Sequence, residues 1–291
     1  MADNIGNKAA HDYHLDTAPT QEGFYVKGAA HSDWGMQNRL SRIFRPESGN
    51  TVMLAFDHGY IMGPTAGLER VDLVIPALAP YVDVLMGTKG VIRSCVPPTV
   101  SAAKCVRLTY DSTVLYDDMS NGGGFACDME NAIRMNADCV AVQTFIGAPG
   151  ESRSLELLCR AADAGARYGI PTLGVVAVGK QMERTERFFL LATRVLAENG
   201  ANIVKSYYCE GFERVAAACP VPIVIAGGKK LPELDALEMA YRAIREGAHG
   251  VDMGRNVFQS AKPLAMMKAI AGVVHQGLTP QDAFQLYNDE K

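Results

Sequence analysis

The chain changes character at about residue 50, where short apolar runs begin to alternate with longer stretches whose apolar residues recur at helical spacing. Runs of the first kind are typical of strands in a parallel sheet, and the longer stretches are typical of the helices that connect such strands. The alternation predicts about eight strand–helix units. The predicted strands are VMLAFDHG (52–59), VDVLMGT (82–88), KCVRLTY (104–110), CVAVQTF (139–145), TLGVVAV (172–178), NIVKSYY (202–208), PIVIAGG (222–228) and GVDMGRN (250–256).

Two of the longer stretches have clear helical spacing and clear ends. One begins at Pro232, which suits the first turn of a helix, and ends at Gly247. The other is closed by Gly169. The residues that carry the spacing are Leu234, Leu237, Tyr241 and Ile244 in the first stretch and Leu155, Leu158, Ala162 and Ala166 in the second.

Eight such units predict an α/β protein with a (β/α)8 TIM barrel, and 291 residues suffice for a barrel with an extension. We expect residues 50–291 to form the barrel and residues 1–49 to form an N-terminal extension. Within the extension, WGMQNRLSRIF (34–44) predicts a short amphipathic helix that caps the barrel or contacts a neighbouring subunit. A doubly wound Rossmann sheet is disfavoured, because the first strand–helix turn, FDHGYIMGP, lacks the G-x-G-x-x-G spacing.

Composition narrows the classes of partner. Hydrophobic residues make up 48% of the chain, charged residues 21%, and the formal net charge is -4, so we expect no nucleic-acid partner. The N-terminal segment MADNIGNKAAHDYHLD is polar, and no apolar run is long enough to span a bilayer, which predicts a cytoplasmic protein without a membrane partner.

The seven cysteines are scattered and form no C-x-x-C pair, which indicates reduced, mostly structural thiols. Cys209 is the exception, because it lies just past the strand that carries the most unusual side chain, where a thiol could accept an acyl group. The alternative is that Cys209 is a small buried hydrophobic residue.

That unusual side chain is Lys205, a single lysine inside the apolar run ANIVKSYY (201–208). Desolvation disfavours the ammonium form, and a neutral amine is a nucleophile toward ketones, so the run predicts Schiff-base chemistry. The alternative is a lysine that reaches the end of the strand or pairs with a carboxylate.

The first predicted strand ends at Asp57, His58 and Gly59. A carboxylate and an imidazole at a strand's carboxyl end suit general acid–base chemistry beside a Schiff base, and a glycine lets a substrate approach closely. Alternatively, Asp57 caps the following turn and His58 packs beneath the loop. Arg107, in the third predicted strand, could pair with Asp57, act as a neighbouring cation for Lys205, or form a structural ion pair; the sequence leaves its role open.

The last two predicted strands end in glycine-rich segments, AGGKK (226–230) and DMGRN (252–256). In a TIM barrel the loops after these two strands usually hold a phosphate group, through backbone amides and a cation. The candidates are Gly227, Gly228, Lys229, Gly254 and Arg255. Each glycine taken alone would more often mark a tight turn, so the prediction depends on the barrel.

A metal-dependent aldolase needs several histidine or carboxylate ligands that converge at strand ends. Of the six histidines only His58 lies at such an end, so we expect no metal site. A buried lysine with a phosphate site and an Asp/His pair indicates covalent enamine catalysis on a phosphorylated keto compound.

The segments that carry this chemistry resemble the class I aldolase family that includes archaeal-type fructose-bisphosphate aldolases, and in particular its thiolase branch, which processes the quorum signal autoinducer-2. The resemblance covers nearly the whole chain. The most similar segments are FDHGY (56–60), IVKSYY (203–208), CPVPIVIAGGKKLPE (219–233), GVDMGRNVFQS (250–260), DWGMQNRLSRIF (33–44), TVMLAFDHGY (51–60) and GPTAGLERVD (63–72).

The resemblance implies specific roles. Lys205 matches the Schiff-base lysine, Asp57 the strand-one catalytic carboxylate, and Gly227, Gly228, Gly254 and Arg255 the phosphate site. It further implies acetyl transfer from a phosphorylated dione to coenzyme A as co-substrate, without a permanently bound cofactor. The family forms large ring-based homo-oligomers, often decamers.

Two departures from the family pattern bear on the substrate. Aldolases of the family carry a tyrosine after the fifth strand, whereas TLGVVAVGK (172–180) has none, which favours a thiolase over an aldolase. The region TYDSTVLYDDMSNGGGF (109–125) departs from the thiolase pattern, and a changed loop there could alter the substrate while leaving the lysine and the phosphate site intact. A class I aldolase or transaldolase-like synthase and a non-catalytic phospho-ligand sensor are the alternatives.

Overall fold

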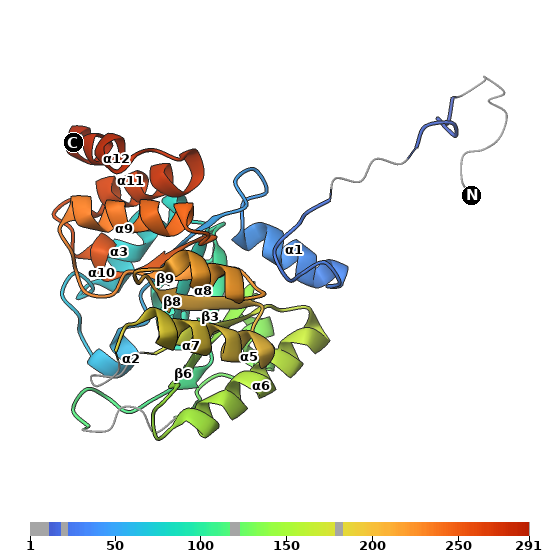
Figure 1. The fold of residues 1–291 in the computed structure, drawn as a ribbon, viewed down its shortest axis with the longest axis horizontal. Helices are drawn as coiled ribbons and strands as arrows, with labels where there is room; N and C mark the ends of the chain where they lie inside the picture. The colour runs from blue at the N-terminus through green and yellow to red at the C-terminus, as the bar shows by residue number, and fades with distance from the viewer. Residues whose placement is uncertain (1–11, 19–22, 117–122, 178–182, 291) are drawn as a thin grey trace.

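The computed structural model describes residues 12–18, 23–116, 123–177 and 183–290. At its centre eight parallel strands form a closed barrel in the order β1-β10-β9-β8-β7-β6-β3-β2 (Figure 1). The predicted (β/α)8 fold is therefore confirmed, and the alternative of a doubly wound Rossmann sheet, which the sequence already disfavoured, is excluded. The barrel strands are β1 (Thr51–Ala55), β2 (Val84–Thr88), β3 (Ala103–Arg107), β6 (Cys139–Thr144), β7 (Thr172–Val176), β8 (Ile203–Tyr207), β9 (Ile223–Ala226) and β10 (Gly250–Met253). A two-stranded antiparallel sheet, β4 (Thr109–Tyr110) and β5 (Gly124–Phe125), follows β3.

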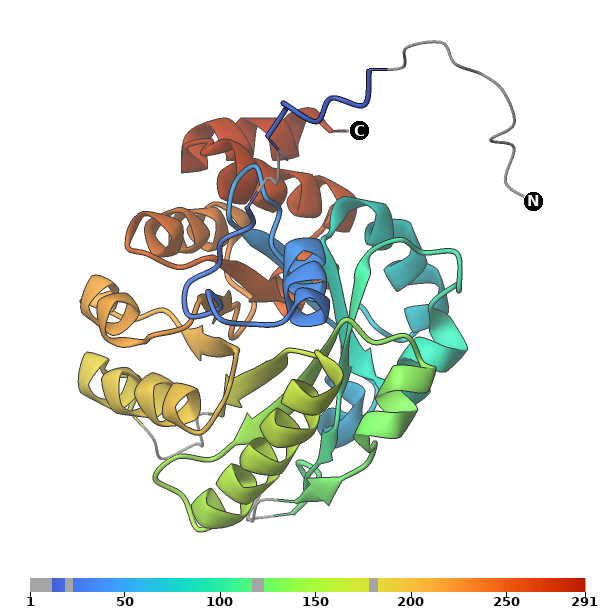
Figure 2. The same cartoon turned by 90° about the vertical axis from the view of Figure 1, so that its right-hand side faces the viewer.

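Helices surround the barrel as an outer ring (Figure 2). Among the described residues, no helix is both long and apolar enough to cross a membrane. The helices are α1 (Trp34–Ile43), α2 (Gly59–Met62), α3 (Val71–Leu78), the 3-10 turn η1 (Ala79–Tyr81), α4 (Lys89–Cys95), α5 (Met129–Arg134), α6 (Glu151–Tyr168), α7 (Glu186–Glu198), α8 (Phe212–Ala218), α9 (Glu233–Arg245), α10 (Arg255–Phe258), α11 (Pro263–Gln276) and α12 (Pro280–Asp289).

The two helices predicted in detail are present as α6 and α9, with different buried faces. Gly169 closes α6 in the left-handed conformation, as expected, whereas Pro232 is the N-cap of α9 rather than a first-turn residue. Small residues lie at the centre of both buried faces because they let the helix backbone approach the sheet closely, and several of the larger apolar residues flank them. The buried residues are Ser154, Leu157, Leu158, Ala161 and Gly165 in α6 and Ala236, Leu237, Ala240 and Ala243 in α9.

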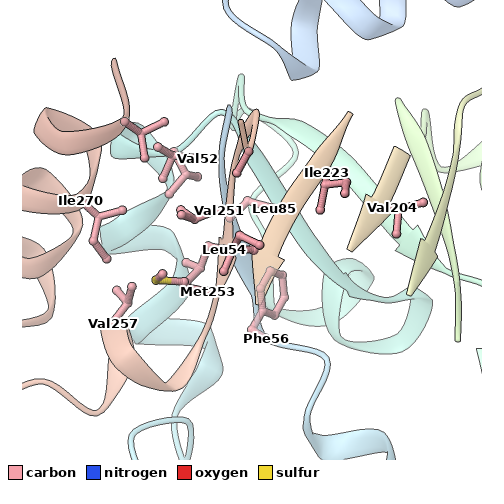
Figure 3. Packing of buried hydrophobic residues seen from close by; sticks show 14 of the residues in the cluster. Val52, Leu54, Phe56, Leu85, Val204, Ile223, Val251, Met253, Val257 and Ile270 are labelled. Atoms are coloured by element: carbon pink, nitrogen blue, oxygen red, sulfur yellow. The ribbon is translucent and has the colours of Figure 1, made fainter. Parts of the chain in front are cut away.

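Two layers of apolar side chains hold the barrel together. Successive residues of a strand point to opposite faces, so most barrel strands contribute to both layers, whereas β10 contributes only to the outer layer, through Val251 and Met253. The outer layer packs under the helices, and Figure 3 shows Val52, Leu54 and Val251 of the barrel wall beside Ile270 of α11. The inner layer fills the barrel and includes Met53 of β1.

Helix α1 covers one end of the barrel (Figure 2). Its buried residues Met36, Leu40 and Ile43 pack into the inner layer. Arg42 of α1 forms an ion pair with Asp138, the residue before β6, at 2.8 Å, which identifies the covered end as the amino end of the strands. The helix predicted over residues 34–44 is therefore present, and the opposite, carboxyl end of the barrel is left for a site.

Asp83, just before β2, ties the amino end to distant parts of the chain. Its carboxylate accepts hydrogen bonds from the Val52 backbone N–H of β1 at 2.7 Å and from Arg45 Nε at 2.5 Å. It also lies 2.9 Å from His275 Nε2, in the last turn of α11. One buried carboxylate thus joins the segment after α1, the first barrel strand and a C-terminal helix.

Candidate active site

Four charged side chains meet toward the carboxyl end of the barrel: Lys205 on β8, Asp252 on β10, Arg107 at the end of β3, and Asp57 just after β1. All four are buried, with exposed fractions of 9%, 1%, 4% and 6%. Buried charges are tolerated only when they are paired, and here two cations face two anions. TIM barrels build their active sites at this end.

Among the described residues, the amine of Lys205 has polar contacts with Asp252 and Met86. Its Nζ atom lies 2.8 Å from Oδ2 of Asp252 and 3.8 Å from the sulfur of Met86 on β2. The carboxylate pairing that the sequence left open for Lys205 is thus present. Sequence reasoning missed Asp252, although the signal was available, because an aspartate in the apolar run GVDMG is as unusual as a lysine in ANIVKSYY.

Asp57 and Arg107 form the second pair, through Arg107 Nε and Asp57 Oδ2. Burial alone would raise the pKa of Asp57, but Arg107, Lys205 and His58 together lower it to about 2. Of the roles that the sequence left open for Arg107, the structure therefore shows the pairing with Asp57. The Asp57 carboxylate is engaged by Arg107, and the helix that follows, α2, has no side-chain cap hydrogen bond.

Tyr60 lies beside this pair and reaches β6. The guanidinium of Arg107 lies 4.9 Å from the centre of its ring, and the hydroxyl donates a hydrogen bond to Gln143 Oε1 of β6 at 2.9 Å. Burial raises the pKa of Tyr60 above its ordinary range. Nothing in the spacing of the sequence marks Tyr60 or Gln143, since they meet only when the barrel closes.

His58 is a neutral group in this setting. Burial lowers its pKa to about 4, despite the opposing effect of Asp57. Its ring packs edge-on against Phe258, with centroids 5.4 Å apart, which agrees with the packing alternative. Its Nδ1 atom is nevertheless buried without a hydrogen-bond partner within the described residues, so it is free to hydrogen-bond to a ligand.

The glycines expected to hold phosphate lie on the neighbouring ends of β9 and β10. Asn256, also missed from the sequence, joins the two loops: its amide donates to Gly227 O and accepts from Leu231 N–H, both at 2.8 Å. A Cβ atom at residue 227 would lie 2.7 Å from Asn256 Nδ2, and one at Gly254 would lie 2.4 Å from Ala55 O. Only glycine allows these loops to approach so closely.

The cations of these loops differ in their surroundings. Arg255 follows Gly254, and its Nε is buried with no hydrogen-bond partner in the part of the chain that the structure describes. Lys229 is exposed. A third cation, Arg184, stacks over Tyr207 at 4.2 Å, and its Nη1 lies 3.4 Å from where a Cβ of Gly228 would be. Sequence reasoning did not identify Arg184.

A cavity of about 360 Å³ adjoins Asp57 between the loops after β1 and β2. Its lining combines apolar side chains with the polar groups of Asp57, Tyr60 and Thr88. Mixed linings of this kind, with a few polar groups among apolar ones, are typical of small-molecule sites.

The two segments that depart from the family pattern are only partly described. Residues 117–122, within 109–125, and residues 178–182, after β7, lie outside the described residues. In the part that is described, the Val114 N–H donates to Ile61 O of α2 at 2.9 Å, so the loop after β3 reaches the loop after β1. Burial raises the pKa of Asp111 in this loop to about 7.

Cys209 is poorly suited to accept an acyl group. Its side chain is buried, and burial together with Glu186 and other glutamates raises its pKa to about 11, so the thiol stays protonated near neutral pH. The interpretation of Cys209 as a small buried residue is therefore favoured. Across the described residues, no three histidine, cysteine or acidic side chains are grouped as a metal site.

Comparison with known sequences places this site in a family context. The model of the DeoC/LacD family of aldolases matches residues 51–260. Over 292 aligned residues the chain is 52% identical to an uncharacterised aldolase of Pasteurella multocida, covering 100% of both proteins. It is 52% identical to the 3-hydroxy-5-phosphonooxypentane-2,4-dione thiolase of an Enterobacter species (100% of this chain, 98% of the relative). The Escherichia coli protein of that name is 51% identical, with 100% of both chains covered.

Solved structures agree with this assignment. An archaeal fructose 1,6-bisphosphate aldolase superposes with a TM-score of 0.75 at 26% identity, covering 83% of this chain and 100% of the other. A second archaeal fructose-1,6-bisphosphate aldolase has a TM-score of 0.75 at 25% identity, covering 82% and 99%. Its structure holds the catalytic lysine covalently bound to the carbinolamine intermediate of the substrate.

Proposed function

The chain belongs to the DeoC/LacD family of aldolases, and on that premise we propose that it is a Schiff-base-forming thiolase. The substrate in this proposal is 3-hydroxy-5-phosphonooxypentane-2,4-dione. The enzyme transfers its acetyl group to coenzyme A and releases dihydroxyacetone phosphate in the processing of autoinducer-2. The observation that carries the proposal is Lys205, a buried lysine in a barrel site, in a chain that matches relatives named as thiolases along its whole length.

Catalysis begins when Lys205 Nζ attacks the C4 ketone, and loss of water leaves an iminium. The thiol of coenzyme A then adds to the C2 ketone. As the C2–C3 bond breaks, C1 and C2 leave as acetyl-coenzyme A, and the bonding electrons pass to the iminium to form an enamine. Protonation at C3 and hydrolysis release dihydroxyacetone phosphate and regenerate Lys205.

Three side chains serve the acetyl-transfer half of the reaction: Asp57, Arg107 and His58. Thiol attack places negative charge on the C2 oxygen, and Arg107 Nη1, which is buried without a hydrogen-bond partner among the described residues, can donate to it. Asp57 fixes Arg107 through their ion pair. The neutral imidazole of His58 can hydrogen-bond to the thiol as it approaches C2.

The phosphate group is held by the loops after β9 and β10. Backbone amides of Gly227, Gly228 and Gly254 provide donors. Arg255 Nε, which has no hydrogen-bond partner among the described residues, provides a charge-assisted hydrogen bond. Lys229 contributes charge from an exposed position. These contacts bind the end of the substrate that becomes dihydroxyacetone phosphate and so orient C4 toward Lys205.

The second candidate is a class I fructose-bisphosphate-type aldolase or a related transaldolase-like synthase. The likeness to archaeal fructose 1,6-bisphosphate aldolases favours it, as does the Tyr60 phenol beside the Asp57–Arg107 pair. Aldol cleavage must remove a proton from a hydroxyl, and burial raises the pKa of Tyr60, so its phenol stays protonated near neutral pH and is poorly suited to accept that proton. A thiolase, whose substrate presents a ketone at the carbon released, has no such need.

The proposal includes a cytoplasmic homo-oligomer, with a ring-based decamer as the form expected from the family resemblance. Exposed aromatic side chains near the amino end of the barrel support assembly, because Trp34 and Tyr25 are 80% and 73% exposed. The seven free cysteines fit a reducing compartment. Coenzyme A is a co-substrate, and the proposal includes no permanently bound cofactor.

Mass spectrometry after borohydride reduction in the presence of dihydroxyacetone phosphate tests the mechanism. We expect one stable adduct on Lys205 and none in Lys205→Ala. Release of acetyl-coenzyme A from the phosphorylated dione, assayed beside fructose 1,6-bisphosphate cleavage, tests the substrate. An adduct without acetyl transfer would leave a Schiff-base aldolase, and absence of the adduct would overturn the proposal.

A further inference from the structure

Asp252 is buried with its carboxylate against the reacting nitrogen. It is 1% exposed, and its Oδ2 lies 2.8 Å from Lys205 Nζ. Apart from that contact, neither of its oxygens has a hydrogen-bond partner within the described chain. A purely structural buried carboxylate is usually satisfied by several donors. Asp252 thus has free lone pairs that can accept and return a proton.

The other nearby groups are poorly suited to that task. Asp57 is held by Arg107, and with a pKa of about 2 it stays ionised and does not retain a proton near neutral pH. His58 has a pKa of about 4 and packs against Phe258, so it is a weak acceptor for an ammonium proton. Among the described residues, Asp252 is the carboxylate in ion-pair contact with Nζ.

We propose that Asp252 is a catalytic residue that takes the ammonium proton of Lys205 and later returns it to the leaving hydroxyl as the Schiff base forms. This inference rests on the proposed function. Proton transfer from Nζ to Asp252 gives a neutral amine and a neutral acid. The amine adds to the ketone carbon, and one nitrogen-bound proton moves to the former carbonyl oxygen, which gives a carbinolamine.

Asp252 then protonates the carbinolamine hydroxyl, which leaves as water, and the nitrogen lone pair forms the iminium. The charges balance, because Asp252 is an anion beside the ammonium at the start and an anion beside the iminium at the end. No net charge has to enter or leave a buried site at any step, which avoids the large desolvation penalty of an unpaired charge.

The surroundings of Asp252 support this cycle. The groups that act on it are Lys205 of β8, Asp57 after β1, and Arg107 and Cys105 of β3. Burial raises the pKa of Asp252, although Lys205 and Arg107 oppose this effect. A carboxyl with a raised pKa holds a proton long enough to act as an acid.

The test is Asp252→Asn, which preserves side-chain size. Protein is mixed with dihydroxyacetone phosphate, quenched with borohydride at increasing times and weighed by mass spectrometry at several pH values. We expect adduct formation on Lys205 to slow by about 10²–10⁴-fold, with a flattened pH dependence. Without borohydride, native mass spectrometry should find the carbinolamine, which is heavier than the imine by one water. The matched control is Asp138→Asn, which removes a carboxylate that is also 1% exposed and ion-paired, but at the amino end of the barrel.

The outcomes separate this inference from the proposed function. If the wild type forms no adduct, the Schiff-base mechanism itself fails. If the wild type forms the adduct and Asp252→Asn forms it at the same rate and with the same pH dependence, only the role of Asp252 is overturned. Should Asp252→Asn not fold, Asp252→Ser is measured with and without formate. Restoration of the rate by formate supports the role, and a wild-type rate without formate excludes it.

Discussion

Replacing Arg107 by methionine removes the partner of a buried carboxylate and should destabilise the barrel strongly. Asp57 and Arg107 are 6% and 4% exposed, so water cannot take the place of the guanidinium. Breaking a buried pair from one side costs about 3–5 kcal/mol, because an uncompensated charge remains. The double variant Arg107→Met/Asp57→Asn should recover a large part of that loss, since both charges are gone.

The pH dependence of the free energy of unfolding gives a second estimate of what this ion pair contributes to stability. The pKa of Asp57 is lowered from 3.8 to about 2, and at about 1.36 kcal/mol per pKa unit this corresponds to about 2–3 kcal/mol of stability. Because the pKa is lowered, this stability is present above about pH 4 and is lost as the pH falls toward 2. In Arg107→Met, burial still acts while the main partner that lowers the pKa of Asp57 is lost, so this pKa should rise and the loss of stability below pH 4 should become smaller than in the wild type.

Urea unfolding between pH 3 and 8, followed by circular dichroism, measures both effects for the wild type, the two single variants and the double variant. A loss below about 1 kcal/mol in Arg107→Met at pH 7, or the same pH slope as the wild type, would refute the reasoning. Either result would mean that water or another cation reaches Asp57 in the variant.

Three further predictions concern activity. Lys205→Ala should abolish turnover while leaving fold and assembly intact, because it removes the covalent electron sink; more than a few per cent of wild-type kcat, in protein free of wild-type contamination, would exclude Lys205 as the nucleophile. Arg255→Ala should weaken a phosphorylated ligand by about 1.5–3 kcal/mol, or about 10- to 150-fold in Kd, and an unphosphorylated analogue hardly at all. Calorimetry checks this, with the exposed Lys229→Ala as a milder comparison, and equal weakening of both ligands would make Arg255 structural. Acetyl transfer to coenzyme A should exceed fructose 1,6-bisphosphate cleavage by about 10²–10⁴-fold in kcat/KM, because the segment TLGVVAVGK (172–180) lacks the tyrosine that aldolases carry there. Comparable kcat/KM values for the two reactions would identify the protein as an aldolase instead.

The sequence predicted the features that depend on local pattern. Alternating apolar runs located all eight barrel strands, and one lysine in such a run located the centre of the site. The helix faces were less accurate, because the spacing of large residues such as Tyr241 drew attention away from the alanines that approach the sheet. Close helix–sheet packing favours small residues, and a search for the largest apolar ones overlooks them.

The rest of the site depends on contacts between strands that are distant in sequence. Asp252 lies 47 positions after Lys205, and their contact exists only because β8 and β10 both line the barrel interior. Tyr60 and Gln143 are 83 residues apart. Neither pairing has a spacing rule, so only closure of the barrel reveals which polar side chains face one another.

The bonds of Asp83 have a consequence for synthesis on the ribosome. Its contact with His275 spans 192 residues, and β1 is completed by pairing with β10 near the other end of the chain. Until β10 emerges, the nascent sheet therefore keeps an open strand edge at β1, and until the end of α11 emerges, Asp83 lacks one of its partners. Open strand edges can pair with other chains. During the long interval between translation of Asp83 and translation of His275, the nascent chain is therefore exposed to aggregation, and we expect chaperones to bind it in this interval.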